Sequence, residues 1–249
     1  MKDTGTPRSL KKHYLLMPLR LFNAGIRKLA AKSHRLEWLA TWWLSPGPEW
    51  FDHFGDQFYT TREQSNTFWM ERGVFSRMIL KPGGSMLELC CGDGFNSRHF
   101  YSTCAGHVLA IDFDHGALWH ARHFHSAPNI EHRFHDLRTG LPPGTFDNIV
   151  WDAAIEHFTE EEIARILGGI RDQLTPDGIL SGHTLVELET GEKHLHQHER
   201  EFKGIEDLKS FFTPHFKHVY VWETKHPMRH NLYFMCSQAP ISLFGGQAD

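Results

Sequence analysis

The sequence predicts an α/β fold in which a mostly parallel, seven-stranded sheet lies between two layers of helices. Three observations predict it. Between residues 85 and 184, apolar runs of strand length alternate with amphipathic runs of helix length. Glycines follow the first of these strands, where a strand of a parallel sheet turns into its helix. Near the C-terminus, two strand-like segments are joined by a linker too short for a parallel crossover, so they should form an antiparallel hairpin at the sheet.

Residues 1–46 form a basic, amphipathic segment that ends at "SPGP". Lysines and arginines alternate there with leucines and aromatic residues at helical spacing, which predicts a helix. Two interpretations stay open for this helix. It packs over the following domain, or it lies on an anionic membrane surface as a peripheral contact. Residues 47–84 are rich in aromatic side chains and are predicted to form a helical lid that ends at Pro82-Gly83-Gly84.

Residues 85–240 carry the main domain, and residues 241–249 form a tail. Strands are predicted at residues 85–90, 107–113, 130–136, 145–154 and 178–184, with helices at residues 95–104, 116–125 and 160–174. The closing hairpin consists of residues 218–225 and 231–237. This succession predicts a Rossmann-like, three-layer sandwich, to which the N-terminal helices are an addition.

The composition of the 249-residue chain argues against several classes of function. Its formal net charge of −4 lacks the basic excess that binding to duplex nucleic acid requires. No apolar run reaches the ~18 residues that a membrane span needs. The four cysteines contain no CxxC pair, so neither a zinc knuckle nor a disulfide framework is expected. A cytoplasmic location fits best, with contact to the inner membrane left open.

The loop "LELCCGDGFNSRHF" (residues 87–100) indicates a bound nucleoside. Gly92 and Gly94 lack a Cβ, so the backbone can approach a ligand closely and adopt positive φ before the next helix. Asp112 follows about 20 residues later at the end of the next strand, where a carboxylate can accept hydrogen bonds from both ribose hydroxyls. Both features lie at the edge of the sheet where open α/β folds bind their ligands.

These residues resemble the first motif of the class I S-adenosylmethionine-dependent methyltransferases, in particular bacterial enzymes that act on small molecules. That motif runs acid-x-Gly-x-Gly-x-Gly, and here it extends from Glu88 to Gly94 with Cys90 at the first glycine. The resemblance covers residues 50–240 and implies S-adenosylmethionine as cofactor and S-adenosylhomocysteine as product. Asp136 would accept a hydrogen bond from the adenine amino group. The implied cofactor-binding residues are Glu88, Cys90, Cys91, Gly92, Asp93, Gly94, Asp112, Phe113, Asp136, Leu137 and Asp152.

Three residues at the carboxyl ends of the fourth and fifth strands are the candidates for catalysis. Methyl transfer from a sulfonium depends mainly on alignment and exclusion of water, but an alcohol acceptor would gain from a general base. His157 is the preferred base, with Glu156 and His183 as further candidates. The alternative is that Glu156 and His157 begin a helix and close the pocket without taking part in the chemistry.

The acceptor is predicted to be a small, polar molecule that is methylated on oxygen or nitrogen, either glycan-related or another secondary metabolite. His194, His196 and His198 alternate and would project to one side of an extended segment. The predicted acceptor-binding residues are His196, His198, Glu199, Arg229 and the lid residue Tyr59. No metal is assigned, although these histidines with Glu156 and His157 resemble the metal site of RNA 3′-terminal methyltransferases, in which Ala153 would be a glutamate.

Three other functions remain as alternatives. A non-catalytic regulatory protein could bind S-adenosylmethionine without turnover, and a nicotinamide-dependent oxidoreductase could use a similar loop. The third is a metal-dependent RNA 3′-terminal methyltransferase, which the histidine pattern resembles. A homodimer is left open.

Overall fold

The computed structural model describes residues 15–43, 67–191, 193–226 and 229–241. The chain divides into two units, residues 1–68 and 69–249. Within the described residues, no helix is long and apolar enough to cross a membrane. Tyr59, which was predicted to border the acceptor, lies outside the described residues.

The first unit contains helix α2 (Met17–Trp43), which confirms the helix predicted from the basic, amphipathic pattern. Leu19, Phe22 and Ile26 follow one side of this helix at helical spacing, and each is more than half exposed. The spacing of Arg20 and Arg27 places their side chains on a different side. Whether the apolar side contacts protein or a membrane surface stays a prediction.

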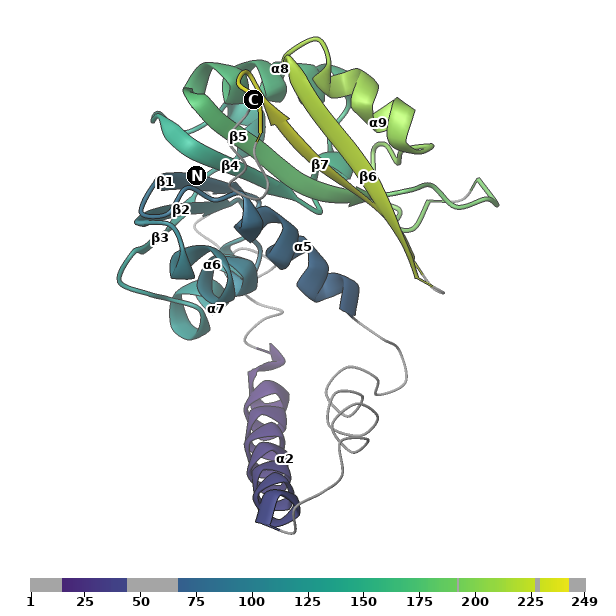
Figure 1. The fold of residues 1–249 in the computed structure, drawn as a ribbon. Helices are drawn as coiled ribbons and strands as arrows, with labels where there is room; N and C mark the ends of the chain where they lie inside the picture. Colours follow the sequence, from purple (N-terminus) through teal and green to yellow (C-terminus); the bar gives the residue numbers. More distant parts are fainter. Residues whose placement is uncertain (1–14, 44–66, 192, 227–228, 242–249) are drawn as a thin grey trace, which may run out of the picture. The chain divides into compact units, whose positions relative to one another are not determined.

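The second unit is built on a seven-stranded sheet with the strand order β3-β2-β1-β4-β5-β7-β6 (Figure 1). The strands are β1 (Ser85–Leu89), β2 (His107–Asp112), β3 (Ile130–Phe134), β4 (Phe146–Asp152), β5 (Leu174–Leu185), β6 (His218–His226) and β7 (Arg229–Ser237). The pairs among β1 to β5 are parallel, whereas β7 is antiparallel to both β5 and β6. The predicted fold class is therefore confirmed, including the C-terminal hairpin.

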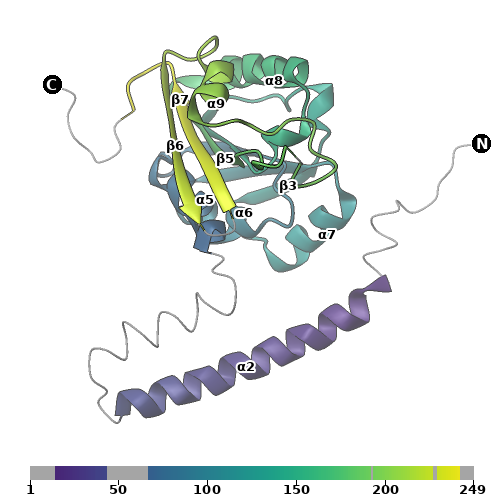
Figure 2. The ribbon, with the colours of Figure 1, turned by 90° about the vertical axis from the view of Figure 1, so that its right-hand side faces the viewer.

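Helices cover both faces of the sheet (Figures 1 and 2). One face carries α5 (Thr67–Met78), α6 (Phe95–His99) and α7 (His115–Phe124), and the other carries α8 (Glu160–Gln173) and α9 (Ile205–Phe212). The helix predicted at residues 95–104 is divided into α6 and a separate 3₁₀ turn, because Phe100 has a φ of −117° between them.

Two apolar clusters follow from the alternation of side chains along the strands. Leu87 and Leu89 of β1 pack in the cluster beneath α8 and α9, whereas Met86 packs in the cluster beneath α6 and α7. Glu88 shares the side of Met86 and is consequently buried beneath α6. A carboxyl group in that position requires a specific explanation, because charged residues are rarely buried without a partner.

The strands β1 to β5 run parallel, so the loops that follow them meet at one edge of the sheet. Backbone hydrogen bonds tie these loops to the neighbouring strands. The Cys91 N–H donates to the Ile111 carbonyl (2.8 Å), and the Ala153 N–H donates to the His183 carbonyl (2.8 Å). This edge contains most of the residues predicted to bind a ligand.

Candidate functional site

The loop between β1 and α6 has the backbone that glycines favour. Cys90, Gly92 and Gly94 have φ values of 56°, 55° and 76°, all in the left-handed region. Cys90 therefore occupies a glycine-like position although it carries a side chain, which costs about 1–2 kcal/mol in this region. A Cβ on Gly92 would meet no atom within 4 Å. This open space allows a ligand to lie directly against the loop backbone.

Asp112 closes the loop from the end of β2. Its carboxylate accepts hydrogen bonds from the backbone N–H of Gly92 (2.9 Å) and of Asp114 (2.8 Å). Each bond uses a different carboxylate oxygen, and an ionised carboxylate offers roughly four acceptor positions. Acceptor positions therefore remain for the two hydroxyls of a ribose. The open space at Gly92 and this carboxylate fit a nucleoside cofactor.

The loop after β3 provides a second carboxylate at the same edge. Asp136 caps a short 3₁₀ helix by accepting from the Arg138 N–H (3.0 Å), and it retains a second oxygen for a ligand. Leu137 is buried in the core beneath α8, whereas Phe113 is 58% exposed. Of these two apolar residues, only Phe113 has a side chain accessible to a bound base.

The Cys90 and Cys91 thiols have no assigned chemistry. Burial raises the pKa of both thiols, and for Cys90 the neighbouring carboxylates of Asp112 and Glu156 raise it further. A thiol that stays protonated is a poor nucleophile. Both cysteines therefore serve as small packing residues of the loop.

Glu88 is buried beneath the loop and accepts a short hydrogen bond from the Ser97 hydroxyl. Burial raises the pKa of its carboxyl group from 4.5 to about 8, although the bond from Ser97 acts in the opposite direction. At neutral pH the carboxyl group is therefore mostly protonated. It fills the space beneath the loop as a neutral group.

We expect the Glu88→Gln variant to gain stability relative to the wild type as the pH rises from 5 to 8. In that range the unfolded wild type loses the Glu88 proton while the folded protein keeps it, so its free energy of unfolding falls by about 1.4 kcal/mol per pH unit. Glutamine does not ionise in this range, so the free energy of unfolding of the variant does not fall in this way. Urea unfolding of both proteins at pH 5.5 and pH 7.5 measures the difference, and an equal offset at both pH values would contradict the assignment.

Asp152 ends β4 within a network of buried polar groups. It lies 3.3 Å from the Arg72 Nε atom of α5 and 3.3 Å from the His183 Nδ1 atom of β5, and it accepts a hydrogen bond from Asn96 (3.0 Å). Burial alone would raise the pKa of Asp152, but the charge of Arg72 and the contact with His183 lower it. Asp152 is thus held as a carboxylate at the edge of the sheet.

His183 was a candidate for catalysis, and its surroundings favour a supporting role. Only 1% of the residue is exposed, and its ring lies between Asp152 and Asn231, whose Oδ1 atom is 3.3 Å from Nε2. Both ring nitrogens thus face polar atoms of the protein. We therefore assign His183 to the orientation of Asp152.

Glu156, His157 and His198 are brought together at the same edge, although 42 positions separate the first from the last. Each offers one oxygen or nitrogen atom, and these atoms lie within 4.8 Å of one another. Glu156 is buried and accepts from the Thr184 hydroxyl (2.9 Å). The Nδ1 atom of His157 lies 3.3 Å from the Gln197 carbonyl. An imidazole and a carboxylate in this arrangement can move a proton or bind a cation.

The predicted extended segment that contains His194, His196 and His198 is wrong. Gly191 has a φ of 73°, and turns and bends follow it along the described part of the segment. His194 and His198 both turn to the buried carboxylate of Glu201, because a buried carboxylate needs hydrogen-bond donors. The side chains of His196 and Glu199 are exposed, and the backbone N–H of Glu199 donates to the Glu156 carbonyl (2.8 Å).

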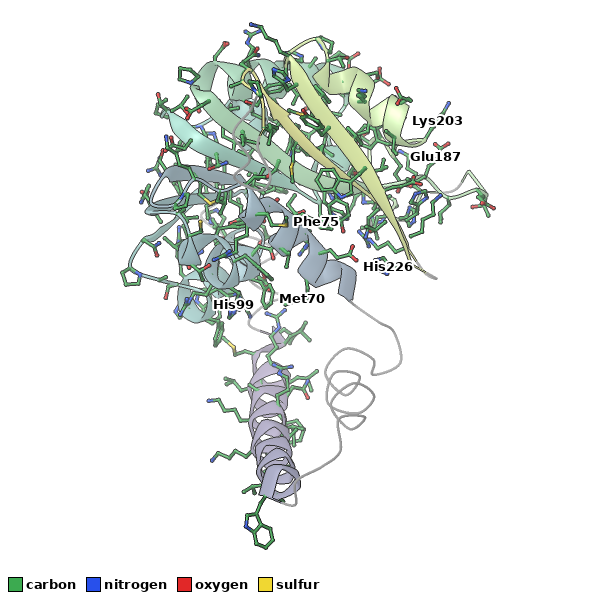
Figure 3. All side chains as sticks on the ribbon, in the orientation of Figure 1. Met70, Phe75, His99, Glu187, Lys203 and His226 are labelled. Atoms are coloured by element: carbon green, nitrogen blue, oxygen red, sulfur yellow. The ribbon has the colours of Figure 1, made fainter. Side chains whose placement is uncertain are left out.

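A cavity of about 830 Å³ lies beside β5 and the β6–β7 hairpin. It is lined by Val186, Glu187, Leu188, Glu189, Gly191, His194, Lys203, Lys225, His226, Arg229 and His230. Figure 3 labels Glu187, Lys203 and His226 on this side of the sheet. Arg229 was predicted to bind the acceptor, and it lines this cavity, whereas His196, His198 and Glu199 do not.

Sequence reasoning missed several residues that support the site. Arg72 comes from α5, whose sequence shows only a helical pattern. Glu71 on the same helix accepts from the Tyr233 hydroxyl (2.8 Å) and thereby joins α5 to β7. Glu201 stood within the histidine-rich stretch and was assigned no role. Such partners depend on packing between distant segments, which a single sequence does not show.

Comparisons with known proteins agree with this architecture. Residues 86–178 match the model of a methyltransferase domain. No curated protein matches the chain. Among solved structures, the complex of DhpI with SAH is 20% identical, covers 77% of this chain and 91% of its own, and has a TM-score of 0.55. The N-methyltransferase NodS of Bradyrhizobium japonicum WM9 is 17% identical, covers 69% of this chain and 96% of its own, and has a TM-score of 0.57.

A third solved structure has the same fold. It is the complex of the Haloferax volcanii Trm112 methyltransferase activator with a putative methyltransferase. It is 13% identical, covers 76% of this chain and 96% of its own, and has a TM-score of 0.56. At such low identities the shared feature is the fold. The match of residues 86–178 shows a methyltransferase domain in that part of the chain. The sheet order around it is that of the Rossmann-like fold predicted from the sequence.

Proposed function

We propose that the protein transfers a methyl group from S-adenosylmethionine to oxygen or nitrogen of a small, polar acceptor that carries an anionic group. A glycan-related compound or another secondary metabolite fits this description. The observation that carries the proposal is the cavity beside β5, because its size is typical of a small-molecule site, for which ~300–1,000 Å³ is usual.

The charges that line the cavity favour a polar, anionic acceptor. Lys203, Lys225 and Arg229 provide three cationic groups, while Glu187 and Glu189 provide two carboxylates. Three histidines add hydrogen-bond donors and acceptors. Arginine binds carboxylate and phosphate groups through its planar array of donors. Arg229 is thus the residue that we expect to hold the anionic group of the acceptor.

A chain of polar contacts connects the cavity with Asp152 at the end of β4. The Arg229 Nε atom donates to Asn231 (2.9 Å), Asn231 lies 3.3 Å from His183, and His183 lies 3.3 Å from Asp152. Both ends of this chain lie at the carboxyl edge of the sheet. An acceptor held at Arg229 could therefore extend toward a cofactor held by the loop after β1.

The residues of this edge would align the reactants and handle the proton. The cofactor, when bound, supplies a methyl group on a sulfonium, whose positive charge disappears on transfer. Asp112 and the loop backbone would fix the position of its ribose. His157 would accept the proton of a hydroxyl acceptor, since its Nδ1 atom faces a carbonyl and leaves Nε2 for the substrate.

A metal-assisted version of the same transfer is the second candidate. Its support is the meeting of Glu156, His157 and His198. His198 holds its Nδ1 atom against Glu201, and such a carboxylate contact is typical of histidines that bind a metal through the other nitrogen. A bound divalent cation would lower the pKa of an acceptor hydroxyl. Ala153 supplies no ligand, so water or the acceptor would complete the coordination.

The test is a search for turnover. The purified protein is incubated with S-adenosylmethionine and with fractions of a polar metabolite extract separated by anion exchange, and S-adenosylhomocysteine is measured by mass spectrometry. We expect product with an anion-exchange fraction, and loss of product after chelation if the metal-assisted version holds. Product with neutral fractions alone would contradict the anionic acceptor, and no product with any fraction would favour a non-catalytic protein.

A variant of Arg229 tests the role of the cavity. Arg229→Gln should raise KM for the acceptor by roughly ten-fold or more, because the charged contact with the acceptor is lost. The affinity for S-adenosylhomocysteine should stay the same, because Asp112 and the loop after β1, to which cofactor binding is assigned, are unchanged. Lys81→Gln, at the opposite edge of the sheet, is the matched control. An unchanged KM would place the acceptor elsewhere.

A further inference from the structure

A second group of side chains suited to metal binding lies between the loop and α7, away from the cluster of Glu156. Asp93, His120 and His125 each offer one atom, and these atoms lie within 4.8 Å of one another. Asp93 stands between the two glycines of the loop, whereas His120 belongs to α7 and His125 ends it. The group therefore joins the cofactor loop to the helix after β2.

His125 has the geometry of a metal ligand. Its Nδ1 atom lies 2.7 Å from the backbone carbonyl of Asp93, so Nδ1 carries the proton and donates it in a hydrogen bond. The tautomer that results leaves the lone pair on Nε2. Histidines that bind metals commonly show this arrangement, in which a carbonyl or carboxylate fixes the ring through its other nitrogen.

Neighbouring residues add to the group. The His99 ring lies 5.5 Å from the His125 ring and 4.6 Å from the ring of Phe95, so a further imidazole stands beside the cluster (Figure 3 labels His99). The His120 ring lies 5.3 Å from His125. Several imidazoles with one carboxylate are a ligand set that suits Zn²⁺ and other divalent transition metals, whereas Mg²⁺ and Ca²⁺ prefer oxygen.

The loop and α7 are already in close contact at this point. A Cβ on Gly94 would lie 2.9 Å from the Ala121 Cβ atom and 2.9 Å from the His132 Nε2 atom. Gly94 thus lets the loop backbone lie against the helix. An ion between Asp93 and α7 would add a bond across this contact without entering the open space at Gly92.

We propose that Asp93, His120 and His125 bind a divalent transition-metal ion such as Zn²⁺, and that this ion fastens the cofactor loop to α7. The ion is structural or regulatory, because its ligands do not include Asp112, His157 or Arg229, the residues to which the transfer is assigned. Metal and cofactor binding are then linked. If the fastened loop binds S-adenosylhomocysteine more tightly by some factor, the ligand strengthens metal binding by the same factor.

The experiment is a titration of metal-free, full-length protein with Zn²⁺ by calorimetry, and with Co²⁺ by visible absorption. The His157→Asn/His198→Asn double variant is the background, because it removes the ligands of the other cluster. His125→Asn is the test variant, and Asp93→Asn is a second one should the first fail to fold. His123→Asn is the matched control, since His123 is an exposed histidine of the same helix whose Nδ1 atom also faces a carbonyl.

The background protein should bind one Zn²⁺ with micromolar or tighter affinity, and Co²⁺ should give visible d–d absorption. His125→Asn and Asp93→Asn should each weaken binding at least ten-fold, while His123→Asn should bind as the background does. If the background protein bound no Zn²⁺, the proposal would be overturned. It would equally be overturned if His125→Asn and Asp93→Asn bound Zn²⁺ with the same affinity as the background protein. Neither result depends on the acceptor or on turnover.

Discussion

The Asp112→Asn variant should bind S-adenosylhomocysteine about 10- to 100-fold more weakly than the wild type. The carboxylate of Asp112 has acceptor positions for the ribose hydroxyls and also holds the N–H of Gly92 and of Asp114. Asparagine offers only one acceptor oxygen, and its amide NH₂ group would face the N–H of Gly92 or of Asp114, which is also a donor. Charge-assisted hydrogen bonds of this kind contribute about 1.5–3 kcal/mol, which gives the expected loss. Isothermal titration calorimetry measures it directly.

A matched control separates lost contacts from general destabilisation. Asp147 is also a strand carboxylate, but it lies at the opposite edge of the sheet, where it binds Lys81 and the Ser85 N–H. Asp147→Asn should lower the melting temperature and leave the affinity for S-adenosylhomocysteine unchanged. If Asp112→Asn bound as tightly as the wild type, the position assigned to the ribose would be wrong.

The His157→Asn variant should lose turnover by roughly 100- to 10,000-fold and keep its affinity for S-adenosylhomocysteine. That range is typical of a lost general acid or base. His157 lies beside Glu156 and His198 and is not among the residues that shape the loop after β1. Its loss should therefore affect kcat and not the cofactor. Steady-state kinetics with an acceptor from the turnover search, together with calorimetry, provide both values.

His107→Asn is the control for this experiment, because His107 is an exposed histidine at the start of β2, at the other edge of the sheet. Its kcat should equal that of the wild type. If the His157→Asn variant stayed active, His157 would only line the pocket and would not act as the general base. A lost cofactor affinity in the same variant would instead assign His157 to the binding of S-adenosylmethionine.

The fold followed from local patterns because each strand is a short apolar run and each connection carries its own turn residues. The strand at residues 107–113 and the helix at residues 160–174 are examples, and β2 and α8 agree with them closely. The division of residues 95–104 was not predicted. It depends on the backbone angle of Phe100, and the sequence there remains compatible with one longer helix.

The site was predictable where the chemistry lies on one loop. Gly92 and Asp112 are an example. In a βαβ unit the end of the second strand lies beside the loop that follows the first strand, so the spacing of the two residues places Asp112 beside Gly92. Contacts between distant segments were not predictable. The approach of Arg72 to Asp152 and of His198 to Glu156 depends on how α5 and the loop before α9 fold over the sheet. The extended conformation predicted for the histidine-rich segment was wrong for the same reason, because His194 and His198 both turn toward the buried carboxylate of Glu201.

The affinity for the cofactor product is the measurement that tests the central claim most directly. Mass spectrometry first establishes that the purified wild-type protein carries no ligand, and calorimetric titration with S-adenosylhomocysteine follows. Micromolar or tighter binding with one site per chain is the result that we predict. Absence of binding in a folded, ligand-free protein would contradict the assignment of the loop after β1, and with it the proposed transfer.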